Sequence, residues 1–359
     1  MTWDTVPANS IPTSQRSDDW CERLFAYADL ETLSEVGFSC GVEKTRSSDY
    51  SIPVYDEADA TTTRRVWLNV GYPGAFREPR GVKIPWNRKW KPSGGSDHHM
   101  VILSKDGGSE WDLWATEPSP NAWLRTKAAL NVDNYKAGYR GSSGVVLAAT
   151  LIHADPQEGN SDGFVVGPLS RGLVRPAEVR RGDVGHALKL VVGSQCSMTG
   201  PEAPSYMGVD HQEIGVRYGC AVSPCSIFES RALTGDLSKM VSDGRRFQLM
   251  LTRSQIISRL SANGMDGKTL DTAAILAQAM VDYGFFIGHT SKSKANFVAD
   301  GAAPSEWRDL GVTDYRVPDV MLRGLILSAS DLRCLEPPIS TLRDGTKTQR
   351  SGPASLIEY

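Results

Sequence analysis

The sequence predicts a mainly β protein of the α+β class, with an antiparallel β-sandwich or jelly-roll-like domain, one or two covering helices and extended termini. The first observation is that short runs of β-branched and aromatic residues, separated by Gly, Pro and Asp turns, recur through the middle of the chain. The second is that few segments have apolar residues at helical spacing. The third is that both ends are polar and contain prolines, which favours extended arms.

Composition excludes several classes of protein. Of the 359 residues, 40% are hydrophobic and 23% are charged, as in an ordinary globular protein and unlike a disordered chain. The formal net charge is −3 and no block of basic residues occurs, so nucleic-acid binding is not expected. No apolar run is long enough to span a bilayer, and the N-terminus lacks the pattern of a signal peptide. We therefore expect synthesis in a host cytoplasm, no membrane span, and either retention there or packaging in a virion.

Changes in residue pattern divide the chain into three expected parts. Residues 1–80 are predicted to form an N-terminal arm and attachment segment, which either packs on the main domain or attaches to a neighbouring subunit. Residues 81–334 are predicted to form the β-sandwich-like main domain. Residues 335–359 are predicted to form an extended C-terminal arm.

Two helices stand out by spacing and by their end signals. The first is predicted over residues 18–33, because Trp20 and Leu24 begin an apolar stripe at near-helical spacing and acidic residues come first. The second is predicted after Asp271, which suits the capping position, and before Gly284, which suits a helix stop. Each helix has an apolar stripe and is expected to cover a sheet.

The strands are predicted from turn residues and from alternation. An Asp-Gly pair at 106–107 lies between the runs 98–103 and 110–114, which indicates a β-hairpin. Residues 184–192 alternate, with His186 at the start of an apolar face, and residues 285–290 read as another strand. These strands are expected to form the sheets of the main domain.

The six cysteines are too sparse for a disulfide scaffold and contain no CxxC pair. Free thiols are the first interpretation, and a disulfide from Cys196 to Cys220 or Cys225 is the alternative. No metal site is predicted from them, because no matching His pair accompanies Cys220 and Cys225.

Tryptophans gather around the predicted hairpin. They suit either a sugar-stacking groove or an ordinary aromatic core. The four candidate carbohydrate-binding tryptophans are Trp86, Trp90, Trp111 and Trp114. Adjacent His98 and His99 face opposite ways on a strand and do not make a metal clamp. Sequence motifs for nucleotide binding, hydrolase elbows and zinc proteases are missing, so no cofactor is expected.

Carboxylates and histidines supply candidates for general acid–base chemistry on a glycan. The candidate catalytic residues are Asp97, His99, Glu178 and His186, with Arg175 as a carbohydrate-binding residue. Two carboxyls at a suitable distance would suit a glycosidase, whereas a histidine with Arg175 and a tyrosine would suit β-elimination from an acidic sugar. The alternatives are that Arg175 and Glu178 form a local ion pair that fixes a turn, and that His186 is a core residue.

Short motifs in a shared order carry a resemblance to known proteins. The segments Ser51–Asp56, Ile84–Ser93 and Glu110–Trp114 are similar to minor tail proteins of phages that infect actinobacteria. The middle and C-terminal parts resemble a poorly characterised, β-rich bacterial family with a suspected action on carbohydrates. Its motifs match at Asp97 and His99, Asp112 and Trp114, Gly172–Arg175 with Glu178, His186–Leu188, and Tyr283–Gly284.

Two positions depart from that family. Gly185 stands where the family has an acid before the histidine, and Gly288–Thr290 stands where it tends to have Asp-Asn-Gly. Both departures count against catalysis. The resemblance therefore implies first a phage virion structural protein, a minor tail or tail-tip component that contacts other tail proteins and host cell-wall glycan as a homo-oligomer. The alternative is a glycoside hydrolase or polysaccharide lyase acting on actinobacterial wall polysaccharide.

Overall fold

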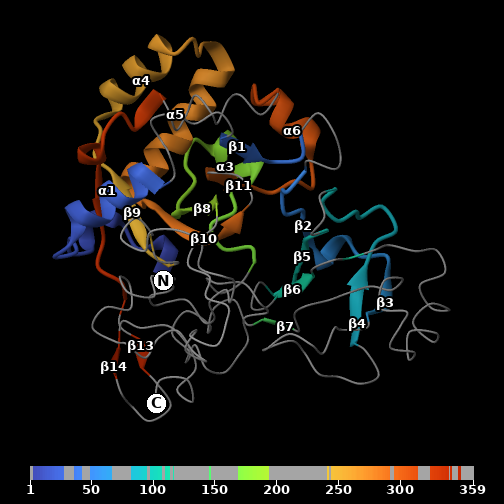
Figure 1. Cartoon of the computed structure of the whole chain (residues 1–359). Coiled ribbons are helices and arrows are strands. Elements are labelled where there is room, and N and C mark those ends of the chain that lie inside the picture. Colours follow the sequence, from blue (N-terminus) through green and yellow to red (C-terminus); the bar gives the residue numbers. More distant parts are fainter. Residues whose placement is uncertain are drawn as a thin grey trace.

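The protein is built on a six-stranded mixed sheet, with helices above it and smaller sheets beside it (Figure 1). The computed structural model describes residues 3–27, 36–42, 49–66, 82–94, 98–106, 110–113, 116, 145–146, 169–193, 241, 244–291, 295–313, 324–338, 340–341 and 347–348. Predictions on the rest of the chain, among them the loop after residue 193, lie outside these residues.

The main sheet contains both parallel and antiparallel pairs. Its strands, in spatial order, are β1 (Val36–Ser39), β11 (Ala295–Val298), β8 (Leu188–Gly193), β10 (Phe285–Ser291), β9 (Arg246–Leu249) and β12 (Leu332–Cys334). The β1/β11 and β8/β10 pairs are parallel, and the other pairs are antiparallel. The register of β10 on β8 shifts between Ile287 and His289, which marks a bulge at Gly288.

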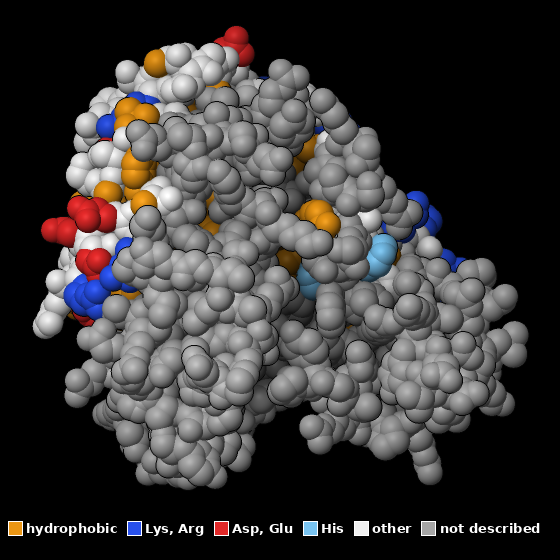
Figure 2. Space-filling view, viewed as in Figure 1, with side chains coloured by type: hydrophobic (Ala, Val, Ile, Leu, Met, Phe, Trp, Pro, Cys, Tyr) orange, Lys and Arg blue, Asp and Glu red, His pale blue; other side chains and the backbone are white. Residues whose placement is uncertain are grey.

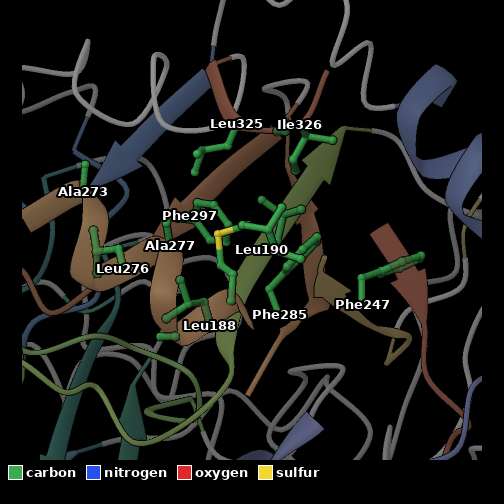
Figure 3. Packing of buried hydrophobic residues seen from close by; sticks show 14 of the residues in the cluster. Leu188, Leu190, Phe247, Ala273, Leu276, Ala277, Phe285, Phe297, Leu325 and Ile326 are labelled. Atoms are coloured by element: carbon green, nitrogen blue, oxygen red, sulfur yellow. The ribbon is translucent and has the colours of Figure 1, made fainter. Parts of the chain in front are cut away.

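The principal core lies between this sheet and the helix pair α4 (Arg253–Ala262) and α5 (Gly267–Asp282). In Figure 3, Leu188 and Leu190 of β8 lie beside Phe285, Phe297 and Ala277 of α5. A second buried cluster on the opposite face of β8 includes Val191 and Val298. The predicted alternation of β8 is therefore confirmed, and both of its faces are buried, as expected for a central strand.

The described N-terminal residues belong to the same core. Helix α1 (Ser17–Tyr27) places Trp20 and Leu24 in the principal cluster, and β1 forms an edge of the main sheet. The helix predicted from residue 18 is thus confirmed over the residues that the structure describes. Short 3-10 turns precede it at Trp3–Thr5 and Ala8–Ser10.

Two smaller sheets share a separate aromatic cluster. One contains β2 (Val54–Asp56), β5 (Met100–Leu103), β6 (Glu110–Leu113) and β7 (Val145–Val146), and the other pairs β3 (Thr62–Val66) with β4 (Val82–Trp86). The predicted hairpin is confirmed, because β5 and β6 pair antiparallel from Met100 opposite Leu113 to Leu103 opposite Glu110. Near the C-terminus, β13 (Ser340–Thr341) pairs with β14 (Lys347–Thr348).

The structure corrects the predicted start of α5 and contains a helix, α4, that was not predicted. Helix α5 begins at Gly267 after Asp266, so Asp271 lies within the helix and is not its cap. Helix α4 was not expected, although Thr252 and Gln255 form a capping box at its start. The other helices in the described part of the chain are α3 (Pro176–Arg181) and α6 (Pro304–Asp309), with 3-10 turns at Glu57–Asp59 and Ala329–Asp331.

The expected α+β, β-rich class is confirmed by these mixed sheets and helices. The sandwich of two antiparallel sheets is not confirmed, because the largest sheet contains two parallel pairs. Among the residues that the structure describes, no helix combines the length and apolar character needed to cross a membrane.

Candidate functional site

Helix α3 and the turn that follows it bring three predicted site residues together. Arg175 precedes the helix, Pro176 occupies its first position, and Glu178 lies in its first turn. Oε2 of Glu178 accepts the backbone N–H of Arg175 at 2.7 Å, which closes the start of the helix. Gly182, with φ of 81°, ends the helix and turns the chain toward His186 and β8.

Glu178 and His186 form a pair that is largely shielded from solvent. Nε2 of His186 lies 3.4 Å from Oε1 of Glu178, and their side chains are 14% and 18% exposed. Nδ1 of the same ring lies 2.9 Å from the carbonyl oxygen of Ala187 and donates to it. Burial lowers the pKa of His186, but the hydrogen bond and charge of Glu178, with smaller effects of the Ala187 carbonyl group and Asp4, raise the pKa overall. The arrangement therefore favours an imidazolium that donates from both nitrogens.

Arg175 links α3 to two other parts of the molecule. Its Nε lies 3.3 Å from Oδ2 of Asp300, and its NH2 lies 3.3 Å from Oδ2 of Asp56 at the end of β2. The alternative of a local ion pair between Arg175 and Glu178 is wrong, because the guanidinium turns to these aspartates and Glu178 accepts the backbone N–H of Arg175 instead. Burial raises the pKa of Asp300, although the N–H groups of Ala302 and Val54 and the charge of Arg175 oppose that rise.

His99 lies in a different environment from this pair. It is 6% exposed, and its backbone N–H donates to Oγ of Ser93 at 2.9 Å just before β5. Neighbouring His98 has φ of 45°, a conformation that is uncommon for a residue other than glycine. The polar contacts of Glu178 and His186 do not include His99. Asp97 lies outside the described residues.

The tryptophans of the hairpin region form a core. Trp86 is 1% exposed and Trp90 is 6% exposed, and both pack with apolar residues of β5 and β6. Tyr55 stacks on Trp90 with ring centroids 5.0 Å apart. Trp111 is partly buried against the same cluster, and Trp114 lies outside the described residues. The rings of Trp86 and Trp90 are thus occupied by packing and offer little face for a sugar.

Three of the six cysteines are described, and all three are buried thiols: Cys21, Cys40 and Cys334. Burial raises the pKa of Cys21 to about 12 and that of Cys334 to about 11, so both are neutral thiols. Cys196, Cys220 and Cys225, the residues of the alternative disulfide, lie outside the described residues. In the part of the chain that the structure describes, no three His, Cys, Asp or Glu residues gather in a group able to hold a metal ion.

A pocket beside the α3–β8 turn was missed by sequence reasoning. It has a volume of about 460 Å³. Its lining comes from three segments: Pro7 and Asn9, then Gly182, Asp183 and Val184, and then Ile275, Gln278, Ala279, Asp282 and Tyr283. The one local signal in the sequence is the predicted helix stop at Gly284, directly after Tyr283. The three segments are distant in sequence, so their meeting could not be predicted.

Charged side chains of both signs lie together on the visible surface. At the left edge of Figure 2, basic and acidic groups adjoin in the region that α1 occupies in Figure 1. Arg16 and Arg23 both pair with Asp19 at the start of that helix. This mixture agrees with the small net charge of −3 and gives no broad basic surface among the described residues of this face.

Comparisons with family models, curated proteins and solved structures find no match for this chain. The resemblance to tail proteins and to a carbohydrate-related family therefore rests on the order of short motifs alone. Function has to be argued from the residues and their geometry.

Proposed function

We propose that this chain is a structural protein of a phage virion, a minor tail or tail-tip component that contacts neighbouring tail subunits and host cell-envelope glycan. The order of motifs shared with tail proteins supports the class. The observation that carries a structural role over a catalytic one is that both carboxylate oxygens of Glu178 and both ring nitrogens of His186 have partners within the protein. A catalytic acid or base needs a proton position open to substrate.

The predicted sandwich or jelly-roll-like arrangement belongs to this proposal. It is supported by the aromatic cluster, in which Ile84 and Trp86 of β4 pack with Met100 and Ile102 of β5, so two small sheets share one core. Sheet pairs of this kind occur in viral and lectin domains. Assembly as a homo-oligomer within the tail, without a membrane span, is part of the same proposal.

A glycan-cleaving enzyme is the second candidate, and one contact favours it. Glu178 and His186 are a carboxylate and a histidine in direct contact, the residue types of an acid–base pair. If a substrate displaced one of their partners, His186 could donate a proton to a leaving oxygen. The substrate class would be a cell-wall polysaccharide, cleaved by hydrolysis or by elimination.

Incubation of the purified protein with mycolyl-arabinogalactan-peptidoglycan tests both candidates. Sedimentation of the wall reports binding, and assays for reducing and unsaturated sugars report cleavage. Glu178→Gln removes the charge of the candidate acid or base. Glu306→Gln is the matched control, because Glu306 of α6 pairs at the surface with Arg180, which lies in α3 with Glu178. Thermal unfolding of both variants checks that the fold is retained.

Binding without release of sugar, in the wild type and in both variants, is the expected result. Release that is lost in Glu178→Gln and kept in Glu306→Gln would replace the structural proposal with the enzyme. Absence of both binding and release would remove glycan contact from the proposal and leave contact with other tail subunits.

A further inference from the structure

The pocket between α5, the α3–β8 turn and the N-terminal segment has walls that are held in place by buried side chains. Arg246, which is 2% exposed, donates to the carbonyl oxygens of Val6 and Tyr283, each at 2.6 Å. Gln248, also 2% exposed, donates to Oδ1 of Asn9 at 2.9 Å and to the carbonyl oxygen of Val281 at 2.6 Å. Two strand side chains thus fasten the N-terminal wall to the end of α5, and the pocket is preformed.

The polar groups that line the pocket are oriented, yet each keeps hydrogen-bonding capacity. Oδ1 of Asp183 accepts the N–H of Gly185 at 3.0 Å, and Oδ1 of Asp282 accepts Nε2 of Gln278 at 3.0 Å. The second oxygen of each carboxylate has no hydrogen-bond partner within the described part of the chain. Asn9 uses its oxygen for Gln248 and retains its NH₂ group as a donor. The pocket therefore offers more acceptors than donors.

Apolar groups supply the rest of the lining. Ala279 and Val184 are buried, and Ile275 and Pro7 add further apolar surface. Tyr283 is the aromatic residue of the lining, and its hydroxyl makes no hydrogen bond to the described residues. An aromatic ring beside carboxylates and amides suits a ligand with one apolar face and many hydroxyl groups. The volume of about 460 Å³ is within the range of roughly 300–1,000 Å³ found for small-molecule sites.

The charge of the lining selects among ligands of this shape. Asp183 and Asp282 are both carboxylates, and the ten lining residues include no Lys or Arg. The carboxyl end of α5 adds partial negative charge close to Asp282. A sugar with a carboxylate or sulfate group would be repelled, whereas neutral hydroxyl groups can donate to the free oxygens.

We propose that this pocket binds a neutral sugar ring, with Asp183, Asp282 and Asn9 contacting its hydroxyl groups and Tyr283 contacting its apolar face. This inference deepens the proposed function, because it gives glycan contact a location and a sugar class. The inference rests on the proposed function only in taking the sugar to come from the host cell envelope.

The test measures binding of small sugars to the full chain by saturation-transfer NMR and calorimetry. The probes are the methyl glycosides of galactose, glucose and arabinose, with galacturonic acid as the acidic counterpart of galactose and ethylenediamine as a plain cation. At least one neutral glycoside is expected to bind, with a dissociation constant on the order of 1 mM, and galacturonic acid is expected to bind at least about tenfold more weakly.

Three substitutions on α5 locate the site. Gln278→Trp places a bulky ring in the pocket and is expected to abolish binding. Asp282→Asn is expected to weaken binding of the neutral glycoside by about tenfold and to narrow its advantage over galacturonic acid. Asp271→Asn removes a carboxylate from the exposed start of the same helix, outside the pocket, and is expected to change nothing.

The inference is overturned if no neutral glycoside binds, if galacturonic acid or ethylenediamine binds as tightly, or if Gln278→Trp binds normally. Sedimentation with cell wall separates this inference from the proposed function. If the Gln278→Trp variant still binds cell wall, the pocket is not the glycan site and the proposed function is kept. If the protein binds small sugars but not cell wall, the pocket is kept as a sugar site and contact with host glycan is lost from the proposed function.

Discussion

Single residues in this protein serve structural roles that their chemistry alone would not reveal. Glu178 and His186 have the chemistry of an acid–base pair, yet their contacts fasten the start of α3 to the start of β8. Arg246 is a cation with 2% exposure whose guanidinium holds main-chain carbonyl groups, and burial lowers its pKa to about 10 despite the charge of Asp4. Such buried cations persist because they satisfy several acceptors at once.

The His186–Glu178 contact predicts a dependence of stability on pH. Because the pKa of His186 is raised in the folded protein, its contribution is fully present below its unfolded value of about 6.5 and is lost as pH rises through the folded pKa. The difference in Tm between wild type and His186→Gln should therefore be largest near pH 5.5 and shrink by pH 8.5. A difference that stays constant, or that grows with pH, would contradict the contact. Glu306→Gln, which removes the exposed partner of Arg180, is the control.

Two glycines with the same backbone conformation predict different costs for a methyl group. Gly284 and Gly182 both have φ of 81°, but a Cβ on Gly284 would lie 2.2 Å from the carbonyl oxygen of Phe247, and one on Gly182 would meet nothing within 4 Å. Gly182→Ala should cost about 1 kcal/mol from backbone strain, and Gly284→Ala should cost clearly more. Urea unfolding measures both, and equal costs would show that the close approach at Gly284 relaxes freely.

At the scale of elements, helix ends and turns explain where each segment stops. Helix α5 runs to Asp282, and Gly284 in a left-handed conformation directs the chain into β10. Helix α4 follows β9 after three residues, and its start is defined by Thr252 and Gln255. The hairpin of β5 and β6 is likewise fixed by its cross-strand pairs.

The cap of α4 predicts a small and specific loss of stability. Oγ1 of Thr252 accepts the N–H of Gln255 at 3.3 Å, and Oε1 of Gln255 accepts the N–H of Thr252 at 2.9 Å. Thr252→Ala should lower the free energy of unfolding by about 1 kcal/mol, and Thr252→Ser should restore most of it. Ser261→Ala, at an exposed position of the same helix, is the control. If Thr252→Ala were as stable as the control, the capping bond would not contribute in solution.

At the scale of the whole molecule, one arginine connects the main sheet to the smaller sheets. Arg175 contacts Asp300, which follows β11, and Asp56, which ends β2. Oδ1 of Asp300 also accepts the N–H of Val54 at 2.9 Å, so a carboxylate with 6% exposure joins the same two regions. The arrangement of the sheets thus depends on a few polar contacts as well as on the apolar cluster around Val191.

Removal of this arginine should destabilise the protein more than removal of its exposed partner. Arg175→Met leaves the Asp300 carboxylate without its guanidinium and should cost about 1–3 kcal/mol, because Arg175 itself is 35% exposed. Asp56→Asn should cost less than about 1 kcal/mol, since the Asp56 side chain is 49% exposed. Chemical unfolding of the two variants provides the comparison. A larger loss of stability in Asp56→Asn than in Arg175→Met would show that Asp56 is the main contact between the sheets.

Local features of the fold could be predicted well. The hairpin, the alternation of β8 and the stop at Gly284 each follow from residues within one turn or one strand, where nearby sterics and hydrogen bonds decide the conformation. The capping box of Thr252 and Gln255 was equally visible in the sequence, although α4 was not expected. The true start of α5 was missed because Asp271 has a suitable side chain but lies inside a helix that already begins at Gly267.

The candidate site was predicted only in part. The predicted catalytic cluster combined Asp97, His99, Glu178 and His186, and the structure places only Glu178 and His186 in contact. His99 bonds instead to Ser93, and Asp97 lies outside the described residues. The sequence did not reveal that Arg175 pairs with two distant aspartates, because its partners depend on which segments pack against α3. Of the two alternatives for the tryptophans, the aromatic core is confirmed for Trp86 and Trp90, because two small sheets bury them.

The sequence by itself determined the β-rich class, the local turns, and the kinds of side chain available for chemistry. Only the tertiary structure decided the order of strands in the mixed sheet, the partners of the buried charges, and the pocket that joins Asn9, Asp183 and Asp282. The physical reason is that local conformation depends on interactions over a few residues, whereas contacts between distant segments form only when long loops close and bury a shared core.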